Sequence, residues 1–297
     1  MPELIAGGTI PAFVNPESGS AAAAAEALER HPAFELRLTE PGKLAESLRE
    51  AVSAGVPRVL VAGGDGTLSA AASILCGTPV ALAVLPGGTL NHFARDHGIP
   101  AEPEEALALA ENGTVGAVDV AYVNDELFLN TSSVGVYTRF VETRDRLESY
   151  CGYWLASLLA GLRILSSLRP MRVTLELEGE KRVYQAPLVF VAVGERSLTP
   201  PGLGRPVEGG GGTLHVVIPR GRRQARRFAR AYARMDRGLP VKTQPLGTDT
   251  VRVDRLRLDL GKHTVKVATD GEINRMRVPL EYRIARGALK VVLPEAG

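Results

Sequence analysis

The sequence predicts a two-domain protein, in which an N-terminal α/β domain of the doubly wound type is followed by a C-terminal antiparallel β domain. Three observations lead to this expectation. Apolar β-branched runs alternate with helical patterns over the first third of the chain, two of those runs end in glycine-rich loops, and short strands with polar turns dominate the second half. Alternating strands and helices are typical of a parallel sheet, which binds ligands at the carboxyl ends of its strands.

The N-terminal elements follow from hydrophobic periodicity and from residues that start or stop helices. We expect strands at residues 10–14, 36–38, 59–62 and 80–85. We expect helices at residues 21–31, 43–54, 68–74, 90–97 and 104–111, the first of them starting near Ser18 or Ser20. Both glycine-rich loops then lie at carboxyl ends of strands.

The C-terminal elements follow from alternating patterns and short polar turns. A hairpin is expected over residues 118–131 around the turn Asn124-Asp125, and a long helix over residues 144–168. Further strands are expected at residues 172–177, 182–193, 214–218, 250–258, 264–269, 278–284 and 288–293, with an irregular exposed loop at 199–213. Such a strand-rich segment indicates an antiparallel domain of the sandwich type.

Composition narrows the class of protein. Of 297 residues, 45% are hydrophobic and 23% charged, which is ordinary for a globular protein, and a net charge of +2 argues against a general nucleic-acid binder. Two cysteines cannot build a disulfide framework, and no His or Cys pair has zinc-site spacing. Because residues 1–9 do not resemble a signal peptide and the longest apolar run, residues 154–162, is too short to span a bilayer, we expect a cytoplasmic protein.

The loop at residues 63–67 reads Gly-Gly-Asp-Gly-Thr and follows a buried strand. Glycines let the backbone approach a ligand closely, and free N–H groups in such a loop suit phosphate oxygens. Asp65 stands where a magnesium ion would be held. The pattern is neither the Walker motif nor the Rossmann fingerprint.

Three further segments share this logic. Residues 86–95, Pro-Gly-Gly-Thr-Leu-Asn-His-Phe-Ala-Arg, again lead from a strand into a helix, with Asn91 as the expected cap. Residues 14–19, Val-Asn-Pro-Glu-Ser-Gly, lie at another strand end. Residues 270–272, Asp-Gly-Glu, form a tight turn with two acids, which by itself is most often a solvated hairpin turn.

Together these segments resemble the diacylglycerol kinase catalytic domain family, which includes sphingosine and ceramide kinases and soluble bacterial lipid kinases. The resemblance covers nearly the whole chain, and it extends to Val118-Asp119-Val120 and to residues 128–135. It implies ATP-dependent, Mg²⁺-dependent phosphorylation of a lipid hydroxyl, with diacylglycerol as the default substrate in phospholipid biosynthesis. It also implies that the chain end returns to the first domain, so we place the ATP-binding domain at residues 1–122 plus 286–297 and the lipid-substrate domain at residues 123–285.

The resemblance assigns roles by position. The family's nucleotide-binding residues fall on Asn15, Pro16, Ser18, Gly19, Thr39, Gly63, Gly64, Asp65, Gly66, Thr67, Ser69, Gly88, Thr89 and Asn91. The catalytic set is Glu272, Asp270 and Asp65, with Glu272 at the position of the general base, although the residues leave open whether Glu272 or Asp65 is the base. Asp65, Asp119 and Asp270 are the metal candidates.

Two departures weaken the expected acidic network. Many relatives have Asp where this chain has His92. Many bacterial relatives also carry Asp-Asp-Gly-x-Leu-Asp at a structural magnesium, whereas residues 210–215 here read Gly-Gly-Gly-Thr-Leu-His. The structural metal site is therefore not expected in its usual form, and the loop would be held by other means.

An arginine-rich segment suggests a membrane contact. Over residues 220–237, Arg223, Arg227, Arg230 and Arg234 recur at helical spacing, opposite aromatic and apolar residues. Such a face is either simply solvated or docks on anionic headgroups, and for an enzyme with a membrane substrate we expect peripheral membrane association. Oligomeric state stays open, with a homodimer among the options.

Two other functions remain open at this point. An enzyme of the NAD kinase type shares a Gly-Gly-Asp-Gly-Thr loop and a related fold, although the Asn-Pro-Glu-Ser-Gly and Asp-Gly-Glu segments favour the lipid kinases. The missing acids at His92 and at residues 210–211 instead suggest a nucleotide- or lipid-binding protein with weak catalysis.

Overall fold

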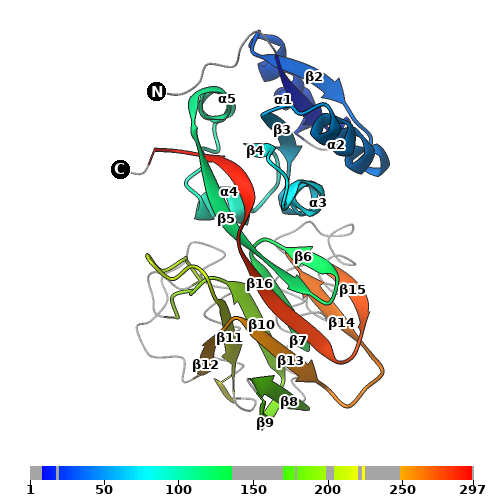
Figure 1. Ribbon diagram of the computed structural model, residues 1–297, viewed down its shortest axis with the longest axis vertical. Helices are drawn as coiled ribbons and strands as arrows, with labels where there is room; N and C mark the ends of the chain where they lie inside the picture. Colours follow the sequence, from blue (N-terminus) through cyan, green and yellow to red (C-terminus); the bar gives the residue numbers. More distant parts are fainter. Residues whose placement is uncertain are drawn as a thin grey trace. The chain divides into compact units, whose positions relative to one another are not determined.

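The chain folds into two compact units. The computed structural model describes residues 9–17, 20–135, 170–177, 179–198, 204–219, 223–224 and 248–295. The first unit comprises Met1–Val120 and Arg286–Gly297, and the second unit comprises Ala121–Ala285 (Figure 1). Two long strands, β5 (Thr114–Val123) and β16 (Leu280–Leu293), contribute residues to both units.

The first unit is built on a parallel sheet with strand order β2-β1-β3-β4-β16. Its strands are β1 (Ile10–Val14), β2 (Phe34–Leu38), β3 (Arg58–Gly63) and β4 (Ala81–Pro86), and β16 joins in parallel through Val291 opposite Leu82. β1 is buried throughout, and β3 and β4 nearly so, as expected for parallel strands that are covered on both faces. The predicted α/β domain is confirmed.

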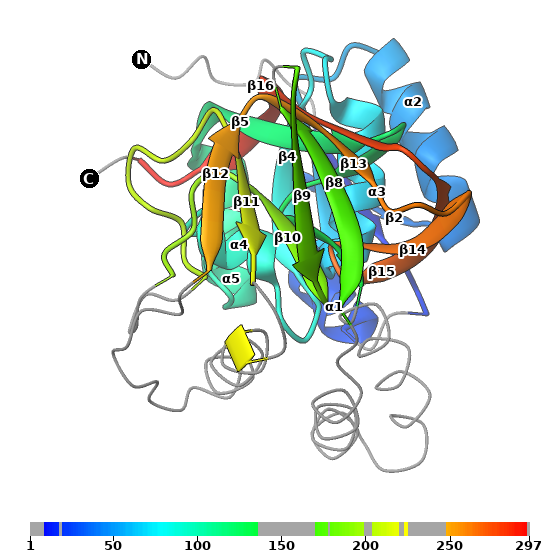
Figure 2. The same cartoon turned by 90° about the horizontal axis from the view of Figure 1, so that it is seen from below.

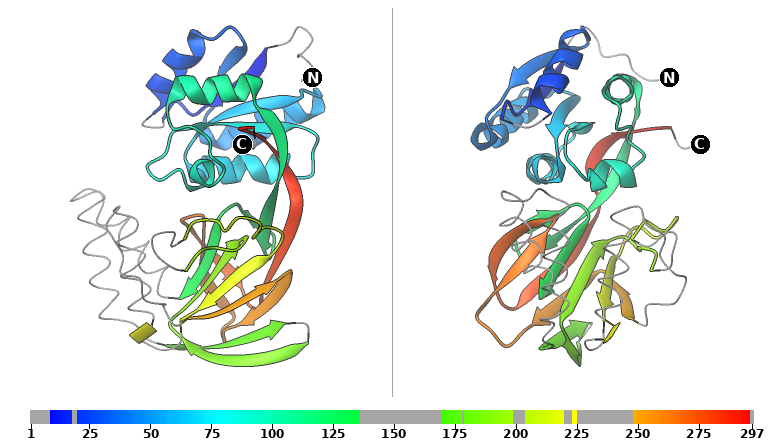
Figure 3. Two further views of the ribbon diagram at one scale, coloured as in Figure 1. Left: turned by 90° about the vertical axis from the view of Figure 1, so that its left-hand side faces the viewer. Right: turned by 180° about the vertical axis from the view of Figure 1, so that it is seen from behind.

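Helices cover this sheet (Figure 3). They are α1 (Ala21–Glu29), the 3₁₀ turn η1 (Pro41–Lys43), α2 (Leu44–Ser53), α3 (Asp65–Leu75), α4 (His92–Asp96) and α5 (Pro103–Asn112). Buried residues of α1 and α5 share one hydrophobic cluster with β1, β3 and β4, whereas α2 packs on α3, which contacts β3 and β4. The sheet is thus held in a rigid frame from which its carboxyl-end loops project.

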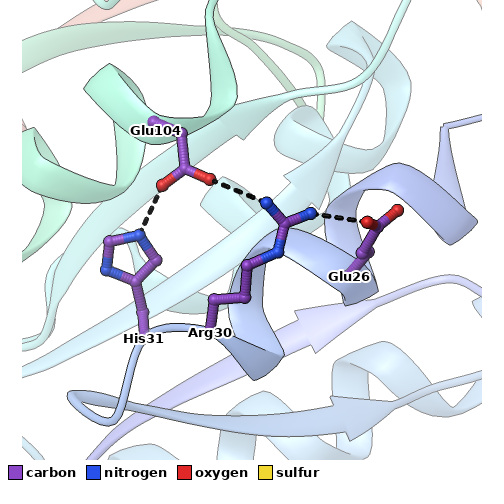
Figure 4. Close-up of polar contacts among 4 residues, drawn as sticks. All are labelled: Glu26, Arg30, His31 and Glu104. Carbon is purple, nitrogen blue, oxygen red and sulfur yellow. Dashed lines mark hydrogen bonds and ion pairs between the residues drawn. The ribbon is translucent and has the colours of Figure 1, made fainter.

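A surface network joins α1 to α5 (Figure 4). Glu26 pairs with Arg30 at 2.6 Å, and Glu104 accepts a contact from His31 at 2.6 Å and from Arg30 at 3.8 Å. The hydrogen bond from His31 holds the pKa of Glu104 below its ordinary value. Because these side chains are largely exposed, solvent screens the network and its contribution to stability is small.

The second unit is an antiparallel sandwich, as predicted. One sheet has the order β12-β11-β10-β7-β14-β15, and the other places β16, β13, β8 and β9 in sequence, with β6 paired to β5. Figure 2 shows β13, β8 and β9 as neighbours. The bounds are β6 (Glu126–Phe128), β7 (Thr131–Gly135), β8 (Met171–Leu177), β9 (Glu180–Ala186), β10 (Leu188–Val193), β11 (Leu214–Ile218), β12 (Asp249–Val253), β13 (Arg255–Asp259), β14 (Thr264–Thr269) and β15 (Glu272–Arg277).

Apolar residues from the two sheets form one core in this unit. Val134 and Val191 of the first sheet belong to the same buried cluster as Val173 and Leu256 of the second. The hydroxyl of Tyr282 lies 3.1 Å from that of Ser132 on the other sheet, and burial raises the pKa of Tyr282. A buried polar contact therefore links the two sheets across the core.

Several predicted strands are divided differently. Residues 182–193 form two strands, β9 and β10, in different sheets, because Pro187 between them has no N–H to donate to a ladder. Residues 250–258 are likewise split at Asp254 into β12 and β13. One strand, β16, contains most of residues 278–284 and 288–293, which were predicted as two strands, and it accommodates Gly287 at φ 56°. The strand β15 was not predicted.

Two further expectations concern helices. The helix predicted at residues 144–168 lies outside the described residues. Within the described residues, none of the helices has the length and apolar character required to cross a membrane.

Candidate active site

The nucleotide residues predicted in the first unit gather at one edge of its sheet. β1, β2, β3 and β4 are parallel neighbours, so the segments that follow them lie along the same carboxyl edge. Asn15 and Pro16 follow β1, Thr39 follows β2, and the two glycine loops follow β3 and β4. Ser18 and Gly19 lie outside the described residues.

Local hydrogen bonds shape the first two of these segments. Asn15 Oδ1 accepts the N–H of Glu17 at 3.0 Å, which closes a turn directly after β1. Buried Thr39 donates its N–H to the carbonyl of Val14 at 2.9 Å, and its hydroxyl donates to the carbonyl of Arg37 at 3.2 Å. Thr39 therefore ties the ends of β1 and β2 together.

The first glycine loop is shorter than predicted, because α3 begins at Asp65 rather than at residue 68. Gly63 ends β3, Gly64 is the N-cap, and Asp65, Gly66 and Thr67 form the first turn of the helix, followed by Ser69. Among the described residues, no side chain caps this end of α3. Its first-turn N–H groups, together with the positive end of the helix dipole, suit an anionic ligand.

The glycines of the two loops are required by close backbone packing. A Cβ added at Gly88 would lie 2.7 Å from the Cα of Gly64, which no side chain tolerates. The N–H of Gly87 donates to the carbonyl of Gly63 at 2.9 Å, and the hydroxyl of Ser20 donates to the carbonyl of Gly87 at 2.9 Å. Ser20, predicted only as a helix start, thus links the segment after β1 to the second loop.

Asp65 bridges the two loops. Its carboxylate accepts the N–H groups of His92 at 3.1 Å and Phe93 at 3.0 Å, the first two residues of α4. Asp65 therefore caps α4, the role predicted for Asn91. A carboxylate has about four lone-pair sites, so Asp65 keeps acceptor capacity after these two bonds.

Asn91 occupies the N-cap position of α4 but makes no capping bond. It adopts φ 47°, and its side-chain amide closes on Gly88, accepting the Gly88 N–H at 2.8 Å and donating to the Gly88 carbonyl at 2.8 Å. The predicted cap is wrong because this amide finds both partners within its own loop. Thr89, between them, is exposed.

The Asp-Gly-Glu segment is a hairpin turn of the second unit. Thr269 of β14 pairs with Glu272 of β15, and Asp270 and Gly271 between them have φ 48° and 93°, as a two-residue turn requires. The Asp270 carboxylate accepts three successive N–H groups, from Leu129 at 2.6 Å, Asn130 at 2.8 Å and Thr131 at 3.0 Å.

The two acids of this turn therefore differ in what they contact. Asp270 anchors the turn to the segment between β6 and β7, which favours a positioning role over metal binding. Glu272 is exposed at the start of β15, and within the described part of the chain its carboxylate makes no hydrogen bond or ion pair. Glu272 is the acid left available to a substrate.

The predicted metal residues do not form a preformed cluster. Asp119 of β5 accepts the N–H of Gly287 of β16 at 2.8 Å, so it holds these two strands together. Among the described residues, no group of three or more His, Cys, Asp or Glu side chains is arranged to hold a metal ion.

The loop that lacks the family's acids is held by protein contacts. Nδ1 of buried His215 accepts the backbone N–H of Arg196 at 3.0 Å. The N–H of Gly194 donates to the carbonyl of Thr213 at 2.9 Å, and that of Glu195 donates to the carbonyl of Gly210 at 2.7 Å. Burial lowers the pKa of His215, which favours the neutral ring that accepts the bond from Arg196.

Most of the first unit matches a known protein family. Residues 9–123 match the family model described as "Diacylglycerol kinase catalytic domain". This segment belongs to the diacylglycerol kinase catalytic domain family. The match contains the two glycine loops and Asp119, and it ends before the Asp-Gly-Glu turn.

Curated relatives of this chain carry lipid kinase names. The "Probable lipid kinase YegS-like" of Enterobacter sp. (strain 638) is 37% identical over 161 residues, which is 52% of this chain and 53% of that protein. The protein of the same name from Cronobacter sakazakii (strain ATCC BAA-894) is 36% identical over 171 residues, 55% of this chain and 56% of its own length. The chain thus spans about half the length of the curated relatives it matches.

Solved structures extend the likeness of fold to both units. The crystal structure of a diacylglycerol kinase from Bacillus anthracis str. Sterne superposes with a TM-score of 0.69, covering 97% of this chain and 97% of that one. The sequence identity is 21%, so the comparison establishes a shared fold. It agrees with the α/β unit and the separate antiparallel β unit described above.

Proposed function

We propose that this chain is an ATP-dependent lipid kinase that transfers the γ-phosphate to a lipid hydroxyl, with diacylglycerol as acceptor and phosphatidic acid as product. The uncapped N-terminus of α3 beside Asp65 carries the proposal, because it lies within a segment of the diacylglycerol kinase catalytic domain family. The names of the relatives support a lipid as the acceptor.

The first unit suits the nucleotide half of this reaction. Phosphoryl transfer needs alignment and charge neutralisation more than covalent chemistry. The first-turn N–H groups of α3 would bind phosphate oxygens, and the hydroxyls of Thr67 and Thr89 would add donors. Because Gly64 and Gly88 pack backbone to backbone, both loops are held in place before a nucleotide arrives.

Asp65 is the residue that fits a nucleotide-bound magnesium ion. Mg²⁺ in kinases is usually held by one or two carboxylates together with phosphate oxygens and water, so a cluster of three acids is not needed. When bound, the ion supplies neutralisation of phosphate charge. Asp65 fits this role because two of its lone-pair sites remain after it caps α4.

The second unit supplies the general base in this proposal. Glu272 would orient the acceptor hydroxyl and accept its proton late in the transfer. Asp270 would serve as a positioning residue, since its three backbone bonds fix the turn that carries Glu272.

The test is a screen of labelled ATP against a total lipid extract, with Asp65→Ala and Glu272→Ala as controls. We expect a labelled lipid that both substitutions abolish, and diacylglycerol micelles should reproduce it. A product that survives both substitutions contradicts the site. ADP release with NAD but not with lipid would establish the NAD kinase alternative, and intact ATP binding without turnover would establish a binding protein.

We further propose peripheral association with anionic membranes through the arginine-rich segment. Arg223 is exposed, whereas Arg227, Arg230 and Arg234 lie outside the described residues. Charge reversal at these three positions should reduce binding to anionic vesicles. Unchanged vesicle binding would remove the proposal without affecting the kinase assignment.

A further inference from the structure

A polar groove of about 720 Å³ lies in the second unit. It is lined by residues of β8, β13 and β16 and by the turn Asn124-Asp125, and it includes none of the residues proposed above for catalysis. Three arginines line it, Arg255, Arg257 and Arg283. Arg255 and Arg257 alternate with the buried Leu256 and Leu258, so they lie on the face of the sheet away from the core.

Arg257 faces glutamates on both neighbouring strands. Its cross-strand partners are Glu281 on β16 and Glu176 on β8. Opposite charges directly across neighbouring strands are favourable. Arg257 therefore has a glutamate directly opposite it on each neighbouring strand, although within the described residues it makes no ion pair with either, and Glu176 pairs with Lys181 at 4.0 Å.

Arg255 and Arg283, by contrast, do not face a carboxylate on the paired strand. They stand directly opposite each other on β13 and β16, so two positive charges face one another across the strands. Like charges in this position destabilise a sheet. Within the described residues, neither guanidinium makes an ion pair with a carboxylate.

The orientation of Arg283 is fixed by an aromatic ring. Its guanidinium carbon lies 3.7 Å from the centroid of the Tyr122 ring. Stacking covers one face of the planar group and leaves its N–H groups free at the edge. Arg283 is thereby held ready to donate two parallel hydrogen bonds to a planar or tetrahedral anion.

We infer that Arg255 and Arg283 form a binding site for a phosphate group. An anion between them would turn a repulsive pair into two charge-assisted contacts, and arginine pairs are well suited to phosphate oxygens. Asp125 also lines the groove, so the site suits a single phosphate group rather than an extended polyanion. The phosphate could belong to a dissolved ion or to a lipid headgroup.

The test follows Tyr122 in the full chain, because its ring reports locally on Arg283 whereas total phosphate binding would include the nucleotide site. Ring resonances of labelled tyrosine are assigned with Tyr122→Phe and followed during titration with inorganic phosphate. We expect saturable shifts that weaken about tenfold or more in the Arg255→Gln, Arg283→Gln double variant. Arg257→Gln, on the same strand and face, should respond within about twofold of wild type. An unchanged response in the double variant, or an equal loss in Arg257→Gln, overturns the inference.

A second titration distinguishes the two sources of phosphate. It compares the response to vesicles of phosphatidic acid in phosphatidylcholine with the response to vesicles of phosphatidylcholine alone. A response to inorganic phosphate identifies a dissolved anion, and a response only to the phosphatidic acid vesicles identifies a headgroup. No response to either overturns the site. Arg255→Glu gives an independent check, since it should pair with Arg283, raise the melting temperature in phosphate-free buffer and abolish the response. A lower melting temperature with a retained response contradicts the inference.

Discussion

Asp65 in the first unit and Asp270 in the second contact the backbone in the same manner. Each lies beside glycine, and each carboxylate accepts N–H groups of consecutive residues far away in the sequence, His92 and Phe93 for Asp65 and Leu129 to Thr131 for Asp270. Their surroundings differ. Asp65 opens a helix whose first turn has no side-chain cap, whereas Asp270 lies in a hairpin turn whose flanking residues are paired.

The two aspartates show how a ligand-binding loop can be distinguished from a structural anchor. An aspartate beside glycine does not itself indicate a metal, because in both units the carboxylate first satisfies backbone donors. What distinguishes the first unit is the set of N–H groups left over at α3. We therefore expect matched substitutions at the two aspartates to have different consequences.

The largest difference should appear in nucleotide binding. Asp65→Asn removes the charge beside the α3 N-terminus and weakens the cap on α4, so we expect ATP·Mg²⁺ affinity to fall by about tenfold or more. Asp270→Asn should leave that affinity within about twofold. Equilibrium dialysis with labelled ATP measures both. Equal losses would mean that both aspartates act only through the fold.

The second prediction separates the two acids of the hairpin turn. Asp270→Ala leaves three N–H groups without their acceptor, so the free energy of unfolding should fall by about 1–3 kcal/mol. Glu272→Gln should change it by less than about 0.5 kcal/mol, because its side chain is exposed. Urea unfolding measures both variants, and lipid phosphorylation should be lost in Glu272→Gln although its stability is intact. A destabilised Glu272→Gln would assign that residue to the fold.

A third prediction concerns the glycine loops. Gly88→Ala places a Cβ against the Cα of Gly64, and such overpacking costs about 1–3 kcal/mol of unfolding free energy. Gly42→Ala is the matched control, since nothing lies within 4 Å of a Cβ added there. The unfolding free energy measured in urea and the affinity for ATP should both fall in Gly88→Ala but not in Gly42→Ala. If Gly88→Ala unfolds like wild type, the two backbones have room to separate.

The sequence predicts those parts of the molecule that depend on local pattern. Apolar runs locate β1, β3 and β4, and parallel pairing then brings the predicted nucleotide residues to one edge. By contrast, β15 was missed because Glu-Ile-Asn-Arg-Met-Arg has few apolar residues and little sign of a buried face. Its pairing with β14 makes it a strand.

Contacts between distant segments were beyond prediction. The Ser20–Gly87 bond joins residues 67 apart, and the bonds of Asp270 span about 140. Nothing near Asp65 in the sequence shows that it caps α4, and Asn91 looked like the cap because its position fits that role. The sequence thus proposes the residues of a candidate site, whereas only the fold shows which of them already have partners.

A fourth prediction concerns how the stability contributed by His215 in the second unit depends on pH. Its pKa is lowered from the ordinary value of 6.5 by burial, so the unfolded chain takes up a proton before the folded one does. The stability that His215 contributes is therefore present above pH 6.5 and is lost as pH falls below it. His215→Gln should flatten the urea-unfolding free energy between about pH 7 and pH 5. An unchanged slope would show that His215 binds its proton equally well in the folded and the unfolded chain.

The smallest effect should come from Glu104 in the first unit. The hydrogen bond from His31 lowers its pKa from 4.5, so its contribution is present above that pH and is lost as pH falls through the folded value. Glu104→Gln should therefore alter stability only slightly at neutral pH and remove a shallow acid dependence, because the network is exposed. Glu105→Gln, in the same first turn of α5, is the control for the helix dipole. If the acid dependence of Glu104→Gln matched that of Glu105→Gln, the turn rather than the His31 contact would be its source.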